Sequence, residues 1–320
     1  PASYKTAAQL GQEVATVLAH GATWTPADDL DRADAAYVSA QLLAPVWQAT
    51  AALSGLRRDG RPVGDVGVLV TRSQRSAARL RPSTSDPLLE PARGAFRLLE
   101  RMQYATVIID ESCLPENGRD LPCLILPNPT FCPQAIWPRL QRYVEQGGKL
   151  ITVANLSLPF DSEPAVHTLL GAVPKSYERA RLRVPVGELQ VPAYNNDWQA
   201  VLTLDSARLL LPFLPLTGEP TEPPAWPAIC VNELGDGRVA TLAFDLFRDY
   251  NRYSSPLYYP LMRHVLDQLG VVHTLHIPGA PTIVPTVQTT AEGSTIFLTN
   301  TARGHYDSGG LMNAACTAIF

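Results

Sequence analysis

Residues 121–160, LPCLILPNPTFCPQAIWPRLQRYVEQGGKLITVANLSLPF, contain two apolar runs separated by a helical pattern. The first run, Leu121–Leu126, ends at a Pro-Asn-Pro turn and predicts a short strand. Apolar residues then recur at helical spacing until Gly147-Gly148, a pair that stops a helix in the left-handed region. The second run, Leu150–Ala154, is long enough for a buried strand. Two buried strands joined by one helix predict a right-handed parallel βαβ unit.

The same alternation of strands and helices extends on both sides of this unit. Two further strands are predicted before it, at Val66–Thr71 and Thr106–Asp110, with a helix at Arg93–Met102 between them. Arg72–Pro91 is rich in Ser, Arg and Pro and is predicted to be a loop. The segments predicted beyond residue 160 are a short helix, a strand pair joined by a Gly-Asp-Gly hairpin signal and a final helix: Val166–Leu170, Ala228–Val231, Arg238–Phe244 and Leu257–Leu269. Residues 64–270 are therefore expected to form one open α/β sheet, mostly parallel, with helices on both faces and the first four strands adjacent.

The flanking sequences differ from this pattern. Residues 7–18 carry one apolar helical face, and a longer helix is expected over Ala36–Leu53 with Val46 and Trp47 directed inward. A basic, Gly-containing linker follows and predicts a domain boundary near residue 60. Residues 180–227 are Pro-rich with short β-type runs and predict an antiparallel hairpin region. Residues 281–300 predict a further hairpin of a small β domain, and residues 302–320 show no coherent pattern.

Composition restricts the class of protein. A chain of 320 residues that is 46% hydrophobic with a net charge of −4 predicts a packed, mildly acidic protein rather than a nucleic-acid-binding one. No run reaches the length of a membrane span, and no signal peptide is visible. The five Cys residues form no CxxC pair and no metal spacing, which favours reduced thiols in a cytoplasmic protein. Because the chain lacks an initiator Met and opens directly into a helical pattern, we expect it to be a fragment.

Three segments together resemble a known domain. VGVLVTRSQ, then ARGAFRLLERMQYATVIIDE, then DLPCLILPN…LQRYVEQGGKLITVA are similar to the amidotransferase-like trimerisation domain of family-42 glycoside hydrolases, the β-galactosidases. The resemblance covers residues 64–270 and implies a flavodoxin-like, class I amidotransferase-like sheet. It also implies that residues 1–60 are the end of a truncated (β/α)8 barrel and that residues 273–320 begin a C-terminal β domain.

The resemblance places the catalytic chemistry outside this sequence. The two catalytic carboxylates of the family lie on the fourth and seventh barrel strands, which would precede residue 1, so no catalytic residue is assigned here. An amidotransferase needs a Cys on a strained turn, but Asn155 or a neighbour stands where that Cys would be, and no GxCxG occurs. The acidic residues of one N-terminal loop are interpreted as solvated turn residues, and no metal or cofactor is predicted: Asp28, Asp29, Asp31 and Asp34.

Several residues are candidates for binding. Trp24 and His20 are predicted to contact a carbohydrate substrate if residues 22–24 form the last barrel strand, although a core Trp is the simpler interpretation. Glu111 ends a parallel strand, where α/β folds place ligands. An exposed aromatic cluster is predicted to form a homotrimer interface or merely to cover a sheet edge: Tyr250, Tyr253, Tyr258 and Tyr259.

Three functional hypotheses follow. The first is the C-terminal non-catalytic portion of a β-galactosidase-like glycoside hydrolase that serves assembly and active-site framing. The second is a stand-alone carbohydrate-binding or assembly module. The third, an enzyme with its own site in an α/β crevice, lacks a GxGxxG, a Walker loop or a GxSxG motif.

Overall fold

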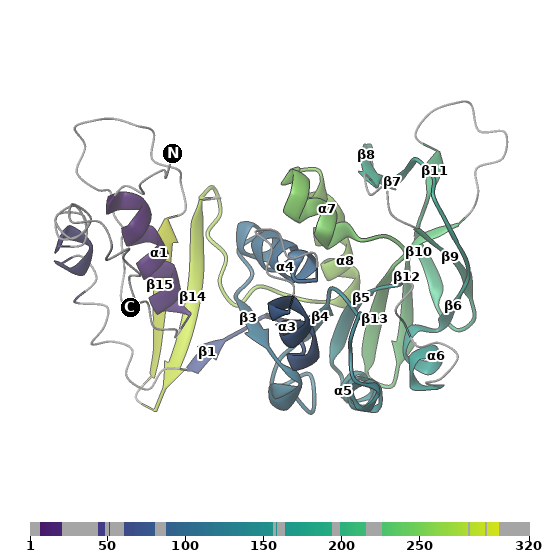
Figure 1. Ribbon diagram of the computed structural model, residues 1–320, viewed down its shortest axis with the longest axis horizontal. Helices are drawn as coiled ribbons and strands as arrows, with labels where there is room; N and C mark the ends of the chain where they lie inside the picture. Colours follow the sequence, from purple (N-terminus) through teal and green to yellow (C-terminus); the bar gives the residue numbers. More distant parts are fainter. Residues whose placement is uncertain are drawn as a thin grey trace. The chain divides into compact units, whose positions relative to one another are not determined.

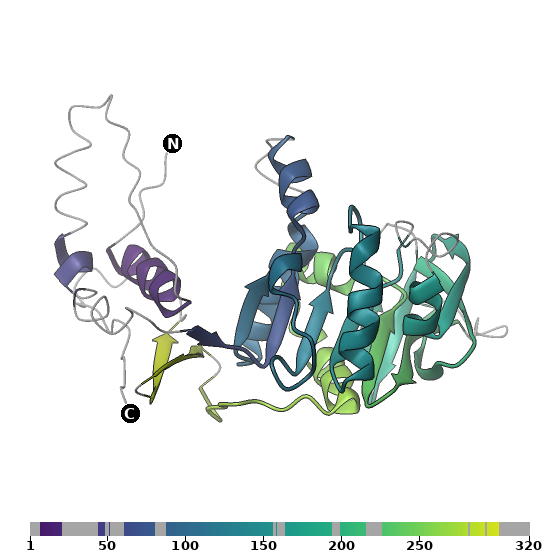
Figure 2. The same ribbon diagram turned by 90° about the horizontal axis from the view of Figure 1, so that it is seen from below.

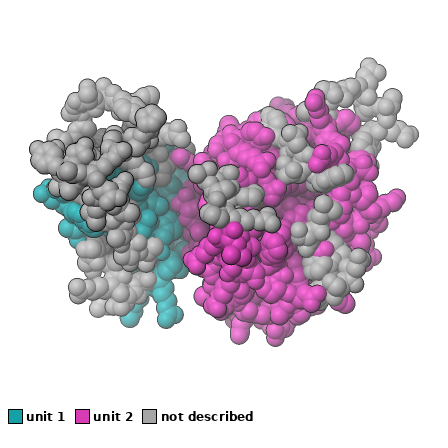
Figure 3. Space-filling view, viewed as in Figure 1, with its two compact units in different colours: residues 1–64, 103–105, 274–320 teal, residues 65–102, 106–273 magenta. Residues whose placement is uncertain are grey.

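A computed structural model describes residues 7–20, 44–48, 51, 61–80, 88–155, 158, 164–193, 199–215, 226–280, 282–291 and 293–300. Contacts within the chain define two compact units (Figure 3). Unit 1 comprises residues 1–64, 103–105 and 274–320, and unit 2 comprises residues 65–102 and 106–273.

Unit 2 is built on a seven-stranded sheet with the order β10-β12-β13-β5-β4-β2-β3 (Figure 1). Its strands are β2 (Val66–Leu69), β3 (Thr106–Ile109), β4 (Cys123–Leu126), β5 (Lys149–Val153), β10 (Arg208–Pro212), β12 (Pro227–Leu234) and β13 (Gly237–Leu242). The five strands from β3 to β13 pair in parallel, whereas β12 and β10 are antiparallel. Numbered along the chain, the parallel strands have the order 2-1-3-4-5 of a doubly wound sheet. The mostly parallel sheet and the adjacency of the first four strands are confirmed.

The apolar runs become strands because they are buried on both faces. Every residue of β2 and β4 is buried, as expected for central parallel strands covered by helices on each side. β12 and β13 form the predicted hairpin around Gly235-Asp236, with Leu234 opposite Gly237. The short apolar runs therefore identified the central strands correctly.

Helices cover both faces of this sheet (Figures 1 and 2). The α-helices of unit 2 are α3 (Arg72–Arg79), α4 (Glu90–Arg101), α5 (Trp137–Glu145), α6 (Pro164–Leu170), α7 (Leu246–Tyr253) and α8 (Tyr258–Leu269), and the 3-10 turns are η1 (Glu111–Cys113) and η2 (Gln134–Ile136). α5 and α6 pack together on one face, and α4 packs against α7 on the other. Gly94 of α4 allows this second contact, since a Cβ there would lie 1.8 Å from the Phe247 carbonyl oxygen.

The Tyr-Val-x-x-Gly-Gly sequence at the end of α5 has a packing explanation. Gly147 adopts φ +90, which an L side chain rarely adopts. A Cβ on Gly148 would lie 2.4 Å from ring atoms of Tyr143, so the ring packs directly on this backbone. The Tyr143 hydroxyl donates to the Leu121 carbonyl at 2.8 Å and to the Lys149 carbonyl at 3.3 Å. The motif therefore ties the end of α5 to both strands of the βαβ unit.

The Pro-rich region forms antiparallel strands as predicted, but they belong to three sheets. β7 (Leu182–Val186) and β8 (Leu189–Ala193) form a hairpin, and β11 (Leu214–Pro215) pairs with β7. β9 (Gln199–Leu204) pairs with β6 (Ala172–Glu178), a strand that the sequence analysis did not predict. β10 instead joins the main sheet beside β12. The region is thus partly an extension of the central sheet rather than a separate insertion.

Unit 1 contains α1 (Ala7–Ala19), β1 (Arg61–Val63), β14 (Ile283–Thr290) and β15 (Gly293–Asn300). β14 and β15 form the predicted hairpin, and β1 pairs with β14. The buried residues of this unit include Val14, Leu18, Val46 and Phe297. The side chain of Gln288 caps α1 by donating to the carbonyls of Leu18 and Ala19.

The second helix expected in unit 1 is described only in part. Of the helix expected at Ala36–Leu53, the structure describes only residues 44–48 and 51, which are helical. Val46 is buried as expected, but Trp47 is 47% exposed, so its predicted inward direction is wrong. The adjoining residue on a helix points about 100° away, and only one of the two faces the core. The division of residues 1–60 and 273–320 into a barrel end and a β domain stays a prediction.

Candidate functional site at the carboxyl ends of the parallel strands

The point where the strand order reverses lies between β2 and β4. In doubly wound sheets, ligands bind in the crevice outside the carboxyl ends of the strands at this point. Here β2 leads into α3, and β4 leads into the loop of residues 127–133. These two segments therefore place their side chains at the strand ends where such a sheet would hold a ligand.

α3 corrects the predicted loop at Arg72–Pro91. Thr71 is the N-cap, and its hydroxyl accepts the Gln74 backbone N–H at 3.2 Å. The Gln74 side-chain oxygen in turn accepts the Thr71 N–H at 3.0 Å, which completes a capping box. The signal was present in the sequence as Thr-x-x-Gln directly after an apolar strand. It was missed because α3 lacks the apolar stripe by which the other helices were recognised.

The Gln74 side chain also reaches the loop after β4. Its Nε2 donates to the carbonyls of Asn128 and Thr130, the latter at 2.9 Å. Gln74 is only 3% exposed, and Thr71 and Asn128 are buried as well. The amide of Gln74 thus joins the two strand ends at the position where related sheets hold a ligand.

The loop after β4 is fixed by further hydrogen bonds. Asn128 accepts the Thr130 N–H at 3.0 Å and donates to the Leu88 carbonyl at 3.2 Å. The Thr71 hydroxyl lies 3.5 Å from the Phe131 carbonyl. Phe131 has φ +61, an uncommon conformation for a residue other than Gly, and its side chain is 55% exposed. The polar groups of this loop therefore bind to the first turn of α3, to Leu88 and to Asn155.

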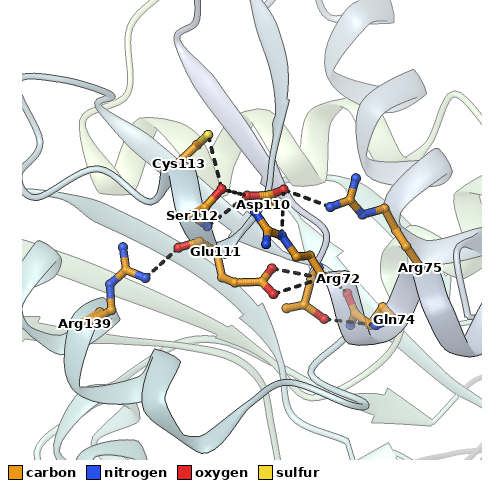
Figure 4. A network of polar contacts seen from close by, with 9 residues as sticks. Arg72, Gln74, Arg75, Asp110, Glu111, Ser112, Cys113 and Arg139 are labelled. Carbon is orange, nitrogen blue, oxygen red and sulfur yellow. Dashed lines mark hydrogen bonds and ion pairs between the residues drawn. The ribbon is translucent and has the colours of Figure 1, made fainter.

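Glu111 occupies the N-terminus of α3 (Figure 4). Both of its carboxylate oxygens accept the Arg72 backbone N–H, at 3.2 and 2.9 Å. The first turn of a helix attracts anions because its N–H groups lack partners within the helix. The Arg139 guanidinium also donates to the Glu111 carbonyl at 2.6 Å. The residue that we predicted to contact a ligand is thus bound by the protein itself.

Asp110, at the end of β3, is held by neighbouring donors (Figure 4). Ser112 donates to it through both its hydroxyl and its N–H, and Arg75 forms an ion pair with it at 2.8 Å. These hydrogen bonds from Ser112, together with the charge of Arg72 and a hydrogen bond from Arg75, lower the pKa of Asp110 to about 2. Asp110 therefore stays ionised and bound at neutral pH and is no candidate for a general acid.

Two thiols lie near these strand ends. Burial, and to a smaller extent the charge of Glu111, raise the pKa of Cys132 to about 12. At neutral pH this thiol is protonated and is a poor nucleophile. Cys113 is exposed, with its Sγ 3.7 Å from the Ser112 hydroxyl. Asn155, where an amidotransferase would carry its Cys, contacts the Asn128 side chain at 3.4 Å and accepts the Tyr177 hydroxyl through its carbonyl.

The predicted tyrosine cluster is only partly exposed, which corrects its description. Tyr258 is fully buried, and its hydroxyl donates to the Pro192 carbonyl at 3.2 Å. Tyr250 is 3% exposed, and its hydroxyl lies 3.2 Å from that of Tyr259. Tyr253, by contrast, is 53% exposed. α7 and α8 thus direct the rings of Tyr250 and Tyr258 into the core.

The carbohydrate-binding candidates lie elsewhere. His20 follows α1, and its Nδ1 donates to the Thr16 carbonyl at 2.8 Å. Burial lowers the pKa of His20. Trp24 and the acidic loop lie outside the described residues: Asp28, Asp29, Asp31 and Asp34. The substrate-binding role of His20 and Trp24 stays a prediction.

Within the described ranges, no group of three or more His, Cys, Asp or Glu side chains has the arrangement of a metal site. No helix in the same ranges is long and apolar enough to cross a membrane.

Comparisons with known proteins identify the fold. Neither a protein-family model nor a curated protein matches the chain. Among solved structures, it is similar to the GH42 β-galactosidase Gan42B from G. stearothermophilus, with 14% identity and a TM-score of 0.65 over 93% of this chain and 45% of that one. It is also similar to the β-galactosidase from Rahnella sp. R3, with 16% identity and a TM-score of 0.66 over 93% of this chain and 47% of that one. A third similar structure is α-L-fucosidase isoenzyme 2 from Paenibacillus thiaminolyticus, with 17% identity and a TM-score of 0.66 over 96% of this chain and 48% of that one.

These likenesses confirm a GH42-like fold for the chain, as the sequence resemblance implied. The chain spans less than half the length of the three solved structures.

Proposed function

We propose that this chain is the C-terminal, non-catalytic portion of a β-galactosidase-like glycoside hydrolase. In this proposal residues 64–270 are an amidotransferase-like domain that serves assembly and frames the active site of a preceding (β/α)8 barrel. Residues 1–60 are the end of that barrel, and residues 273–320 begin a C-terminal β domain. The fold likeness supports the proposal, because it extends over nearly all of this chain but under half of each similar β-galactosidase.

One observation carries the non-catalytic assignment. At the switch point the polar groups are bound to one another: Gln74 joins the loops after β2 and β4, and Glu111 occupies the N-terminus of α3. A site that binds a ligand keeps such groups available for it. The raised pKa of Cys132 removes the one partly buried thiol at this edge as a nucleophile. The arrangement therefore favours a structural domain over an amidotransferase or another crevice enzyme.

The remaining parts of the proposal concern partners and location. The substrate of the whole protein is a carbohydrate, and the assembly is a homotrimer formed through residues 64–270, with exposed Tyr253 as one contact. No cofactor is required for glycosidic cleavage by two carboxylates. The cysteines at 113, 123, 132 and 230 are free thiols, which is consistent with a reducing, cytoplasmic location.

The catalytic part of the proposal is tested by turnover. The purified 320-residue chain is incubated with an aryl β-galactoside and, separately, with glutamine. The protein at its full encoded length is assayed in parallel as the positive control. We expect galactoside cleavage by the full-length protein only and glutaminase activity by neither. Turnover of either substrate by the 320-residue chain, abolished by a point substitution within it, would refute the non-catalytic assignment.

A further inference from the structure

α3 has few buried residues. The capping box and Gln74 fix its first turn, whereas Gln74 and Ala78 are the only residues of the helix that are buried. In Figure 2 the helix extends away from the sheet. Leu80, which caps its far end, is 83% exposed. An isolated helix of eight residues is marginal in water, so the stability of α3 depends on contacts beyond its own backbone hydrogen bonds.

The exposed side of α3 is positively charged. Arg72, Arg75 and Arg79 follow one another at spacings of three and four and share one side of the helix. Asp110 pairs with the first two, with side-chain distances of 3.6 and 2.8 Å. Arg79 has no ion pair within the part of the chain that the structure describes. Arg75 and Arg79 also repel each other at the i,i+4 spacing, which weakens an uncovered helix further.

We propose that the outer face of α3, formed by Arg75, Arg79 and Leu80, docks against an acidic surface of a second copy of this chain. The proposal rests on the assembly role proposed above and names the contact that supports it. The chain has a net charge of −4, so the basic face is opposite in sign to the molecule as a whole. Arg is also enriched in protein interfaces and among the residues that dominate their binding energy.

A nucleic acid is the less suitable partner for this face. Phosphate binding needs uncompensated cations, and Asp110 places a carboxylate between Arg72 and Arg75. For binding to a protein surface that carries carboxylates, the charge of Arg79 and an apolar contact to Leu80 are sufficient. The combination of one unpaired Arg with an exposed Leu therefore fits a protein partner better.

The test compares self-association of three variants of the protein at its full encoded length by sedimentation velocity. Arg79→Glu reverses the charge on the docking face, and Leu80→Ser removes the apolar contact. Arg93→Glu is the matched control, because Arg93 is an exposed residue of the neighbouring helix α4. We expect R79E to weaken self-association about tenfold or more through like-charge contact, L80S to weaken it as well, and R93E to leave it unchanged. Added salt should weaken self-association of the wild type and reduce the difference in affinity between the wild type and R79E.

The outcomes separate this inference from the proposed function. If the wild-type protein is a monomer, both the assembly role and the docking face are refuted. If it assembles and the R79E and L80S variants assemble as tightly as R93E, the assembly role stands and the docking face is wrong. Binding of a DNA duplex that R79E abolishes, with self-association unchanged, would also overturn the choice of a second copy.

Discussion

Replacement of Gln74 by Glu tests whether this side chain joins the ends of β2 and β4 or merely caps α3. Glu is as common as Gln at this position of a capping box, and an acid in the first turn of a helix gains about 0.3–1 kcal/mol. If Gln74 served α3 alone, Q74E would be neutral or stabilising. In the structure, however, Nε2 donates to the carbonyls of Asn128 and Thr130. A carboxylate cannot make either bond.

The size of the effect follows from these two bonds. Each buried polar group left without a partner costs about 1–3 kcal/mol. The loss of both bonds from Nε2, together with a carboxylate that faces the two carbonyl oxygens at a position only 3% exposed, outweighs the favourable helix term. We expect Q74E to lower the free energy of unfolding by about 3 kcal/mol, which corresponds to roughly 6–12 °C in Tm for a unit of this size.

Thermal and urea unfolding of wild type, Q74E and Gln74→Met, followed by circular dichroism, measure this effect. Q74M removes the bridge without adding charge and should also be destabilised. The deficit of Q74E should shrink at acid pH, because its carboxyl then carries a proton and can donate one bond. A Q74E protein as stable as wild type at neutral pH would show that the bridge between the strand ends contributes nothing.

Two further outcomes are expected. Gly94→Ala should lower the Tm, because overpacking against the Phe247 carbonyl costs about 1–3 kcal/mol. Gly11→Ala in α1 is the control and should leave the Tm unchanged, since no heavy atom lies within 4 Å of the new Cβ. Equal Tm values for the two variants would contradict the α4–α7 packing. Asp110, whose folded pKa of about 2 lies below its usual 3.8, should contribute stability that is present above pH 4 and lost as the pH falls toward 2. Between pH 4 and pH 2 the unfolding free energy of Asp110→Asn should therefore decrease less than that of the wild type. An equal decrease in both proteins would contradict the stabilisation of the Asp110 carboxylate by Ser112.

The central sheet could be predicted because its strands are continuous apolar runs bounded by turn residues. Parallel strands are buried on both faces, so β2 and β4 needed no side-chain alternation to be recognised. α3 could not be recognised by the same approach, because only Gln74 and Ala78 face the interior. β6 was missed because it alternates little and lies between a short helix and the Pro-rich region.

The arrangement at the strand ends depends on contacts that no local pattern reveals. Gln74 binds carbonyls that are 54 and 56 residues away, and Glu111 binds an N–H 39 residues away. The sequence showed Glu111 at a strand end but could not show that α3 begins beside it. Similarly, the helical spacing of Tyr250 and Tyr258 could have indicated burial, but which side of α7 and α8 meets the sheet is a tertiary property.

The assembly role is tested most directly by the mass of the protein at its full encoded length in solution, measured by multi-angle light scattering at micromolar concentration. We expect a particle of three times the mass of one polypeptide, because a heterologous patch on each subunit closes a ring. A particle with the mass of a single polypeptide would contradict it and would leave residues 64–270 without the function proposed for them.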